Sequence, residues 1–293
     1  MTSRERVLTA LRHEEPDLVP FNMRVCEELL ARWRERTGDP AADWCTHWGH
    51  DVRPMEGFAV PPCPPGLPRE EWTPPVPPAE VAATAGRVRS FQEAGIAICS
   101  GYQMGIFEQA KDWLGDVETL TLPLLDAGRC ELVLDRVTEW KMAVYGAWVK
   151  TGVDVVWIGD DLGTQRSLVM SPAAYRRWYR PRHQRLIAHL KGINPQVRVA
   201  FHCCGHVTPL IPDLIEIGVE VLEAVQAEAM DLAFLKREYG REIAFWGGIG
   251  AQSVLARRSR EEVVEGVRRT LEVMMPGGGY IAAPCHTLTE EVT

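Results

Sequence analysis

Short runs of apolar and β-branched residues recur along the chain, separated by longer amphipathic stretches. This rhythm predicts strand–helix units and a parallel sheet, because consecutive parallel strands need a crossover long enough to hold a helix. The expected strands occupy 18–23, 96–99, 153–158, 197–201, 219–222, 243–246 and 280–283, and an eighth fits within 44–52. No strand leads into a Gly-x-Gly-x-x-Gly turn, which disfavours an open dinucleotide-binding sheet. Eight units in 293 residues predict a (β/α)8 barrel.

Caps and prolines delimit the expected helices. Ser171-Pro172 opens a helix over 172–190 that Pro181 should kink, and Ser259 opens another over 260–274. Further helices are expected at 4–12 and at 209–217, the latter closed by Gly218. Residues 54–78 carry ten of the 21 prolines and predict an extended excursion within one domain spanning 1–293.

Charge and hydropathy exclude several classes of protein. Lys and Arg total 32 against 40 Asp and Glu, for a net charge of −8 without a basic block, so nucleic-acid binding is not expected. No apolar stretch approaches the roughly 20 residues needed to cross a bilayer, and the N-terminus does not resemble a signal peptide. Eight scattered cysteines do not form a disulfide framework. The sequence therefore predicts a cytoplasmic protein without a membrane segment.

Polar and metal-type residues gather where the expected strands end. A (β/α)8 barrel carries its active site at the carboxyl ends of its strands. The candidates there are Asp160 and Asp161 for catalysis, Gln165, Glu223, Gln226, Trp246 and His286 for substrate contact, and His202, Cys204 and Cys285 for a metal.

His202 and Cys204 are two residues apart at a strand end, so their side chains should point to one side while Cys203 points to the other. Cys285 follows the last strand at the equivalent level. One imidazole and two thiolates make a recognised catalytic zinc set with an open fourth position. The plainer alternative is that these cysteines are buried thiols without a metal.

Asp160 and Asp161 are adjacent carboxylates, so one should point into the barrel mouth and the other away from it. Such a pair acts as a general acid or base, anchors substrate or supplies an additional metal ligand. Equally, one of them can cap a turn through backbone N–H groups.

The chain also resembles the uroporphyrinogen decarboxylase superfamily. The likeness rests on Ser3–Leu8 with the Glu15-Pro16-Asp17 turn, on 152–161, on Phe201-His202-Cys203-Cys204-Gly205 running into 210–215, and on 278–281. The resemblance implies a (β/α)8 barrel. It also implies one of the two activities of the family, which are tetrapyrrole decarboxylation and zinc-dependent methyl transfer between corrinoid proteins and thiols.

The methyltransferase branch fits this sequence better than the decarboxylase branch. Decarboxylases of the family hold substrate carboxylates with an arginine-rich segment after the first strand, where this chain offers only Arg24 beside two acids. The methyltransferases carry zinc ligands at the positions of His202, Cys204 and Cys285. The resemblance thus implies zinc, a small-molecule substrate and a corrinoid methyl donor on a partner protein.

Two other interpretations remain open on sequence grounds: a metal-independent decarboxylase, and a non-catalytic barrel that binds a corrinoid or scaffolds a partner. The chain also stops at Thr293, shortly after the last expected strand, where family members continue into a closing helix. Either the barrel lacks that helix, with a partner subunit such as a second copy in a homodimer covering the gap, or the chain is shortened.

Overall fold

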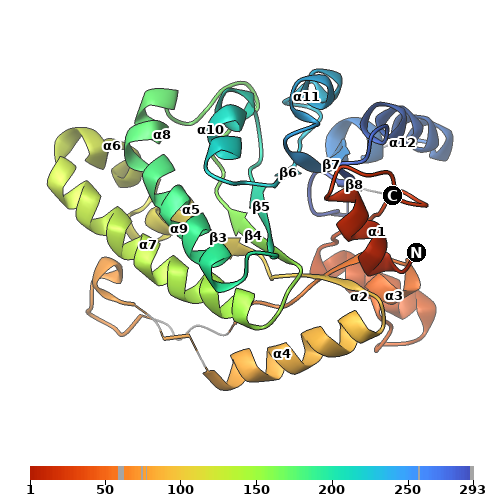
Figure 1. The fold of residues 1–293 in the computed structure, drawn as a ribbon, viewed down its shortest axis with the longest axis horizontal. Coiled ribbons are helices and arrows are strands. Elements are labelled where there is room, and N and C mark those ends of the chain that lie inside the picture. The colour runs from red at the N-terminus through yellow and green to blue at the C-terminus, as the bar shows by residue number, and fades with distance from the viewer. Residues whose placement is uncertain (59–62, 74, 77, 257, 291–293) are drawn as a thin grey trace.

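A computed structural model describes residues 1–58, 63–73, 75, 76, 78–256 and 258–290. Parallel strands curl around an axis with helices outside them (Figure 1). Their order is β1-β2-β4-β5-β6-β7-β8, and β3 pairs with β4 beside this path. The strands are β1 Val52–Pro54, β2 Ala97–Cys99, β3 Gln103–Met104, β4 Val155–Gly159, β5 Arg198–His202, β6 Val221–Ala224, β7 Ala244–Ile249 and β8 Tyr280–Pro284.

The N-terminal segment bridges β8 and the residue before β1 through isolated backbone hydrogen bonds. Phe21 forms an isolated parallel bridge with Ala282, and the amide of Asp51 donates to the Phe21 carbonyl at 2.9 Å. The expected strand over 18–23 is therefore an extended segment with isolated bridges rather than a continuous ladder. Pro20 contributes to this because it has no N–H to donate, although its carbonyl accepts the Ala282 amide at 2.8 Å.

The eighth strand begins later than expected. The region 44–52 forms the short helix α3, Trp44–His47, and β1 starts only at Val52. The Asp43 carboxylate accepts the Thr46 amide at 2.7 Å and caps this helix. The spacing of apolar residues along the sequence does not predict a helix cap of this kind.

Fifteen helical segments are present in the described residues. They are α1 Ser3–Ala10, α2 Glu27–Thr37, α3, η1 Arg69–Glu71, α4 Pro78–Glu93, α5 Ile106–Leu114, α6 Asp116–Leu125, α7 Ala127–Lys150, α8 Pro172–Trp178, α9 Arg180–Ile193, η2 Thr208–Leu210, α10 Ile211–Glu216, α11 Leu232–Tyr239, η3 Ala251–Leu255 and α12 Arg260–Met274. Each of them is too short or too polar to span a bilayer.

Two of the predicted helix starts and breaks are confirmed. The expected helix over 172–190 divides at Tyr179 into α8 and α9, with Pro181 in the first turn of α9. Ser259 caps α12 in a reciprocal capping box with Glu262. The proline-rich excursion holds η1 and the ends of β1 and α4, while its residues 59–62, 74 and 77 lie outside the described residues.

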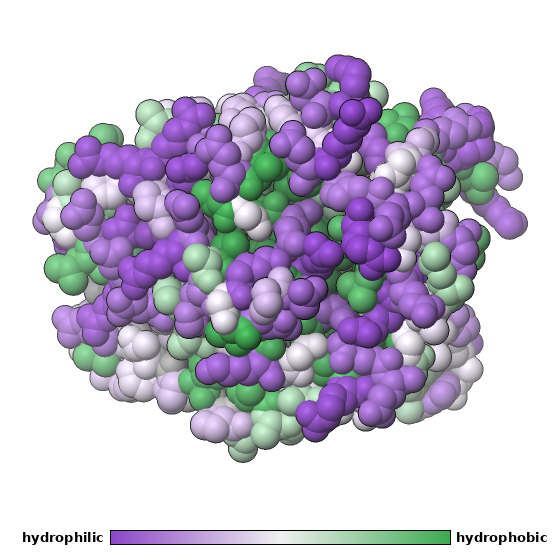
Figure 2. Space-filling view, viewed as in Figure 1, coloured by the Kyte–Doolittle hydropathy of each residue, from purple (hydrophilic) through white to green (hydrophobic). Residues whose placement is uncertain are grey.

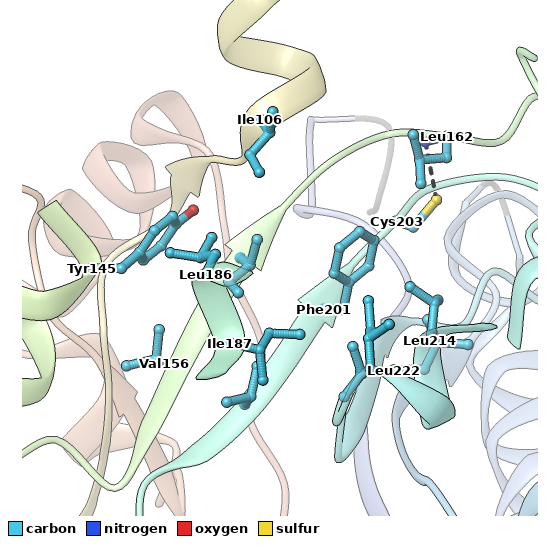
Figure 3. Packing of buried hydrophobic residues seen from close by; sticks show 14 of the residues in the cluster. Ile106, Tyr145, Val156, Leu162, Leu186, Ile187, Phe201, Cys203, Leu214 and Leu222 are labelled. Carbon is cyan, nitrogen blue, oxygen red and sulfur yellow. Dashed lines mark hydrogen bonds between the residues drawn. The ribbon is translucent and has the colours of Figure 1, made fainter. Parts of the chain in front are cut away.

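Side chains alternate strictly across the barrel wall. On β5, Val199 and Phe201 face the surrounding helices, whereas Ala200 faces the interior. Figure 3 shows Phe201 and Cys203 on the helix side, near Leu214 of α10 and Leu222 of β6. The interior cluster comprises Val7, Leu11, Val52, Ala97, Cys99, Val155, Trp157, Ala200, Val221, Ala244, Trp246, Ile281 and Ala283. In contrast to this apolar interior, the molecular surface in Figure 2 is largely hydrophilic.

Helix α1 covers the amino-terminal end of the barrel. Val7 and Leu11 enter the interior cluster, and both are buried. Ion pairs secure this cover, since Arg4 contacts Asp154 at 2.9 Å and Arg6 contacts Asp51 at 2.6 Å. The opposite, carboxyl-terminal end of the strands is the one left for a site.

We predict that Leu11→Ala lowers the free energy of unfolding by about 2–5 kcal/mol, because it opens a cavity in a packed interior. Urea denaturation followed by circular dichroism measures this change. Leu18→Ala is the matched control: Leu18 is 65% exposed, so its loss should change stability by less than about 0.5 kcal/mol. Equal effects in the two variants would contradict this account of α1.

Candidate metal centre at the barrel mouth

His202 ends β5, and the chain continues in the same alternation through Cys203 and Cys204. The thiol of Cys204 lies 3.5 Å from Nε2 of His202. Cys203 points the other way, where it is fully buried and its sulfur accepts the Leu162 amide at 3.2 Å. The local geometry therefore pairs His202 with Cys204 and leaves Cys203 in the outer core, as the spacing predicted.

Asp161 joins this pair from the loop after β4. Its Oδ1 accepts the amide of Cys204 at 2.8 Å and lies 3.5 Å from Nε2 of His202. In the described part of the chain, Asp161, His202 and Cys204 form the one group of three whose metal-ligating atoms all lie within 4.8 Å of one another. The Asp161 side chain is 37% exposed, so the cluster is open to the mouth.

Glu223 holds the far side of the His202 ring. Its carboxylate contacts Nδ1 of His202, and both side chains are buried. Burial alone would lower the pKa of His202, but the charge of Glu223 and the hydrogen bonds with Cys204 and Glu223 outweigh it and raise the pKa to about 10. Arg24 lies 3.6 Å from the other oxygen of Glu223. A histidine oriented by a buried carboxylate is a common support for a metal ligand.

Asp160 faces away from the mouth. It is fully buried, and its oxygens accept the amides of Ile106 and Glu108, each at 2.8 Å. Nε2 of the fully buried His183 lies 2.7 Å from the same carboxylate. Asp160 thereby caps α5, and a Cβ on Gly105 would overlap its carboxylate. Of the two adjacent acids, only Asp161 reaches the mouth.

The structure does not bring Cys285 into the cluster. Its thiol donates to Oε2 of Glu228 at 3.4 Å, and its sulfur accepts the Ala251 amide at 3.3 Å. Burial raises the pKa of Cys285 to about 12, so the thiol is protonated in this arrangement. The described geometry thus brings His202 and Cys204 together with Asp161 and places Cys285 against Glu228 and Ala251.

The residues expected to contact substrate lie in different places. Gln226 supports the loop after β5, because its Oε1 accepts the Gly205 amide at 2.9 Å. Trp246 is buried, and its indole N–H donates to Asn22 at 2.7 Å. Gln165 and His286 are exposed on the loops that follow β4 and β8. None of these four side chains forms a hydrogen bond with Asp161, His202 or Cys204, whereas the Glu223 carboxylate contacts His202 directly.

Two aromatic side chains lie beside the cluster, and one of them, Tyr102, was not among the sequence candidates. The rings of Tyr102 and Trp157 both meet the His202 ring edge to face, with centroids 5.6 and 5.5 Å away. The Arg24 guanidinium lies 4.2 Å from the centre of the Trp157 ring. Tyr102 comes three residues after β2, so its place near a strand end was the available signal.

The donor set suits zinc. Zinc sites combine imidazole nitrogen, thiolate sulfur and carboxylate oxygen, and here one of each converges while a buried glutamate fixes the imidazole. A purely carboxylate cluster would instead suit magnesium or calcium.

Comparisons with known proteins match both fold and family. The family model for uroporphyrinogen decarboxylase (URO-D) matches residues 117–293. A solved methyltransferase from Methanosarcina mazei is similar over 98% of this chain and 94% of that chain, at a TM-score of 0.72 and 19% sequence identity. At that identity the likeness concerns the fold.

More distant solved structures also match. A psychrophilic glycoside hydrolase family 10 endo-β-1,4-xylanase matches at a TM-score of 0.48 and 10% identity, covering 81% of this chain and 78% of that one. D-psicose 3-epimerase matches at 0.45 and 12%, covering 83% and 80%. No curated protein sequence matches this chain. Since the URO-D model covers more than half of the residues, including every strand from β4 to β8, the chain belongs to the uroporphyrinogen decarboxylase (URO-D) family.

Proposed function

We propose that this protein is a zinc-dependent methyl or alkyl transferase that acts on a thiol-type substrate. The observation that carries the proposal is the convergence of Asp161, His202 and Cys204 at the mouth, with Glu223 buried behind the histidine. Membership of the URO-D family and a fold shared with a methyltransferase support it.

In this proposal Nε2 of His202 and the sulfur of Cys204 hold the metal. Asp161 supplies a third donor in the described arrangement, whereas the family resemblance points to Cys285. Zinc in such a site supplies Lewis-acid chemistry and lowers the pKa of a bound thiol or water. The metal content of single variants can decide between Asp161 and Cys285.

The protein side chains position the reactants. Glu223 keeps Nδ1 of His202 occupied, so Nε2 faces the mouth. Asp160 and His183 fix the end of β4 against α5 and thereby place Asp161. We assign Asp160 a positioning role, since both of its oxygens are already engaged in the core.

In the proposed reaction a methyl group passes from its donor to the substrate sulfur. The bond between the methyl carbon and its donor breaks, the donor keeps the electron pair, and a new bond joins that carbon to the substrate sulfur. The thiol proton leaves before the attack, and an Asp161 that does not ligate the metal can accept it. A corrinoid carried by a partner protein is a suitable donor, because it can keep the electron pair.

A metal-independent decarboxylase is the second candidate, and one observation favours it. The Arg24 guanidinium is 27% exposed beside the cluster and can receive a substrate carboxylate. A single arginine suits a substrate with few carboxylates better than one with many.

We predict about one zinc per chain in wild-type protein and its loss in Cys204→Ser, because zinc sites of this kind need the thiolate. Elemental analysis of protein purified without chelator measures this. Zinc affinity is then compared between Asp161→Asn and Cys285→Ser. The substitution that weakens zinc binding more identifies the third ligand. Cys130→Ser is a matched control, since Cys130 is buried in the outer core. Wild-type levels of zinc in Cys204→Ser would overturn the site.

We further predict that Asp160→Asn and Asp161→Asn separate support from chemistry. Asp160→Asn should lower the free energy of unfolding by about 2–4 kcal/mol, because it weakens the buried hydrogen bonds of this carboxylate with His183 and with the amides of Ile106 and Glu108. Asp161→Asn should change stability by less than about 1 kcal/mol, since Asp161 is partly exposed. Chemical denaturation of metal-free protein checks both values. Similar stability losses would contradict the opposite orientations of the two acids.

Activity is tested by incubating the protein with methylcobalamin and a small thiol and measuring the methyl thioether by mass spectrometry. We expect turnover that a chelator abolishes and added zinc restores. Release of CO2 from a carboxylated porphyrinogen by chelated protein, without thioether formation, would favour the decarboxylase instead.

A further inference from the structure

A second candidate site lies at the opposite end of the barrel from the mouth. A pocket of about 560 Å³ opens where α11 ends and where the turn before β8 begins. Its lining includes the side chains of His13, Lys236, Arg237 and Arg241 together with Gly277. These segments precede β7 and β8, so the pocket is at the amino-terminal ends of the strands.

The pocket is cationic although the chain as a whole carries a net charge of −8. Its lining contains no carboxylate. In the described ranges, no carboxylate forms an ion pair with Arg237 or Arg241, and Nζ of Lys236 donates to the carbonyl of Gly278. Glu15 lies beside the pocket, where it accepts the Gly277 amide at 2.8 Å and its charge acts on Lys236.

A structural role explains only part of this arrangement. Cations in the last turn of a helix interact favourably with its dipole, and this covers Lys236 and Arg237 at the end of α11. It does not cover Arg241, which lies beyond the helix, or His13, which comes from the segment after α1. The Arg237 guanidinium also lies 5.5 Å from the centre of the Phe234 ring, so Arg241 is the arginine of the pocket that these structural roles leave without an explanation.

The backbone around the pocket is held in place. His13 has a left-handed conformation, with φ of 58°, and its Nδ1 donates to the carbonyl of Gly240 at 3.0 Å. A Cβ on Gly279 would lie 2.7 Å from Nδ1 of His13, so the turn before β8 needs glycine to approach this closely.

We propose that this pocket binds a phosphate-bearing small molecule. Arginine guanidinium groups match phosphate oxygens with paired N–H donors, and the Lys236 ammonium group adds a further positive charge. The site is separate from the metal centre and does not depend on the proposed methyl transfer.

Isothermal titration with pyrophosphate at constant ionic strength tests the proposal. The wild type should bind pyrophosphate saturably, and Arg237→Gln/Arg241→Gln should bind it at least tenfold more weakly. Arg87→Gln/Arg89→Gln is the matched control, because it removes two exposed arginines from α4 and the same total charge. Its affinity should equal that of the wild type.

Hydrogen exchange locates the ligand. Pyrophosphate should protect the amides of 236–241 and 276–279 and leave those after β4 and β5 unchanged. Absence of saturable binding in the wild type, equal weakening in both double variants, or protection confined to the mouth would each overturn the proposal.

Discussion

The strict alternation of side chains across the barrel wall is the constraint on which the site depends. Alternation places Ala200 and His202 inside and Phe201 outside on β5, and it continues past the strand end to Cys204. A shift of one residue would turn His202 into the helical layer and Cys203 into the mouth. The apolar packing outside the wall therefore fixes the chemistry inside it.

The same constraint resolves the two adjacent aspartates. Asp160 falls on the outer side, where α5 and His183 engage both of its oxygens, and Asp161 falls on the inner side beside His202. Two identical side chains thus have different roles because they lie on opposite sides of the barrel wall. Glu223 occupies the inner side of the next strand and pairs in register with His202, so orientation of the imidazole is built into the sheet.

Much of this was predictable from the sequence, because it follows from periodicity. Strand–helix alternation predicted the barrel, and the His202-x-Cys204 spacing predicted that these two side chains share a face. Glu223 was expected to contact substrate, and its place behind His202 depends on the pairing of β5 with β6, which spacing within one strand does not reveal. The Asp43 cap that delays β1 is likewise a local hydrogen bond without a periodic signal.

The position of Cys285 was the least predictable, because it depends on three loops at once. Glu228 and Ala251, from the segments after β6 and β7, both contact its sulfur, and neither contact has a sequence signature. We propose that His202 and Cys204 hold the metal irrespective of the position of Cys285.

X-ray absorption at the zinc edge of the purified protein tests this claim most directly. We expect at least one sulfur at about 2.3 Å from the zinc together with imidazole nitrogen at about 2.0 Å, and loss of this sulfur in Cys204→Ser. A shell of oxygen and nitrogen alone, unchanged in Cys204→Ser, would contradict it.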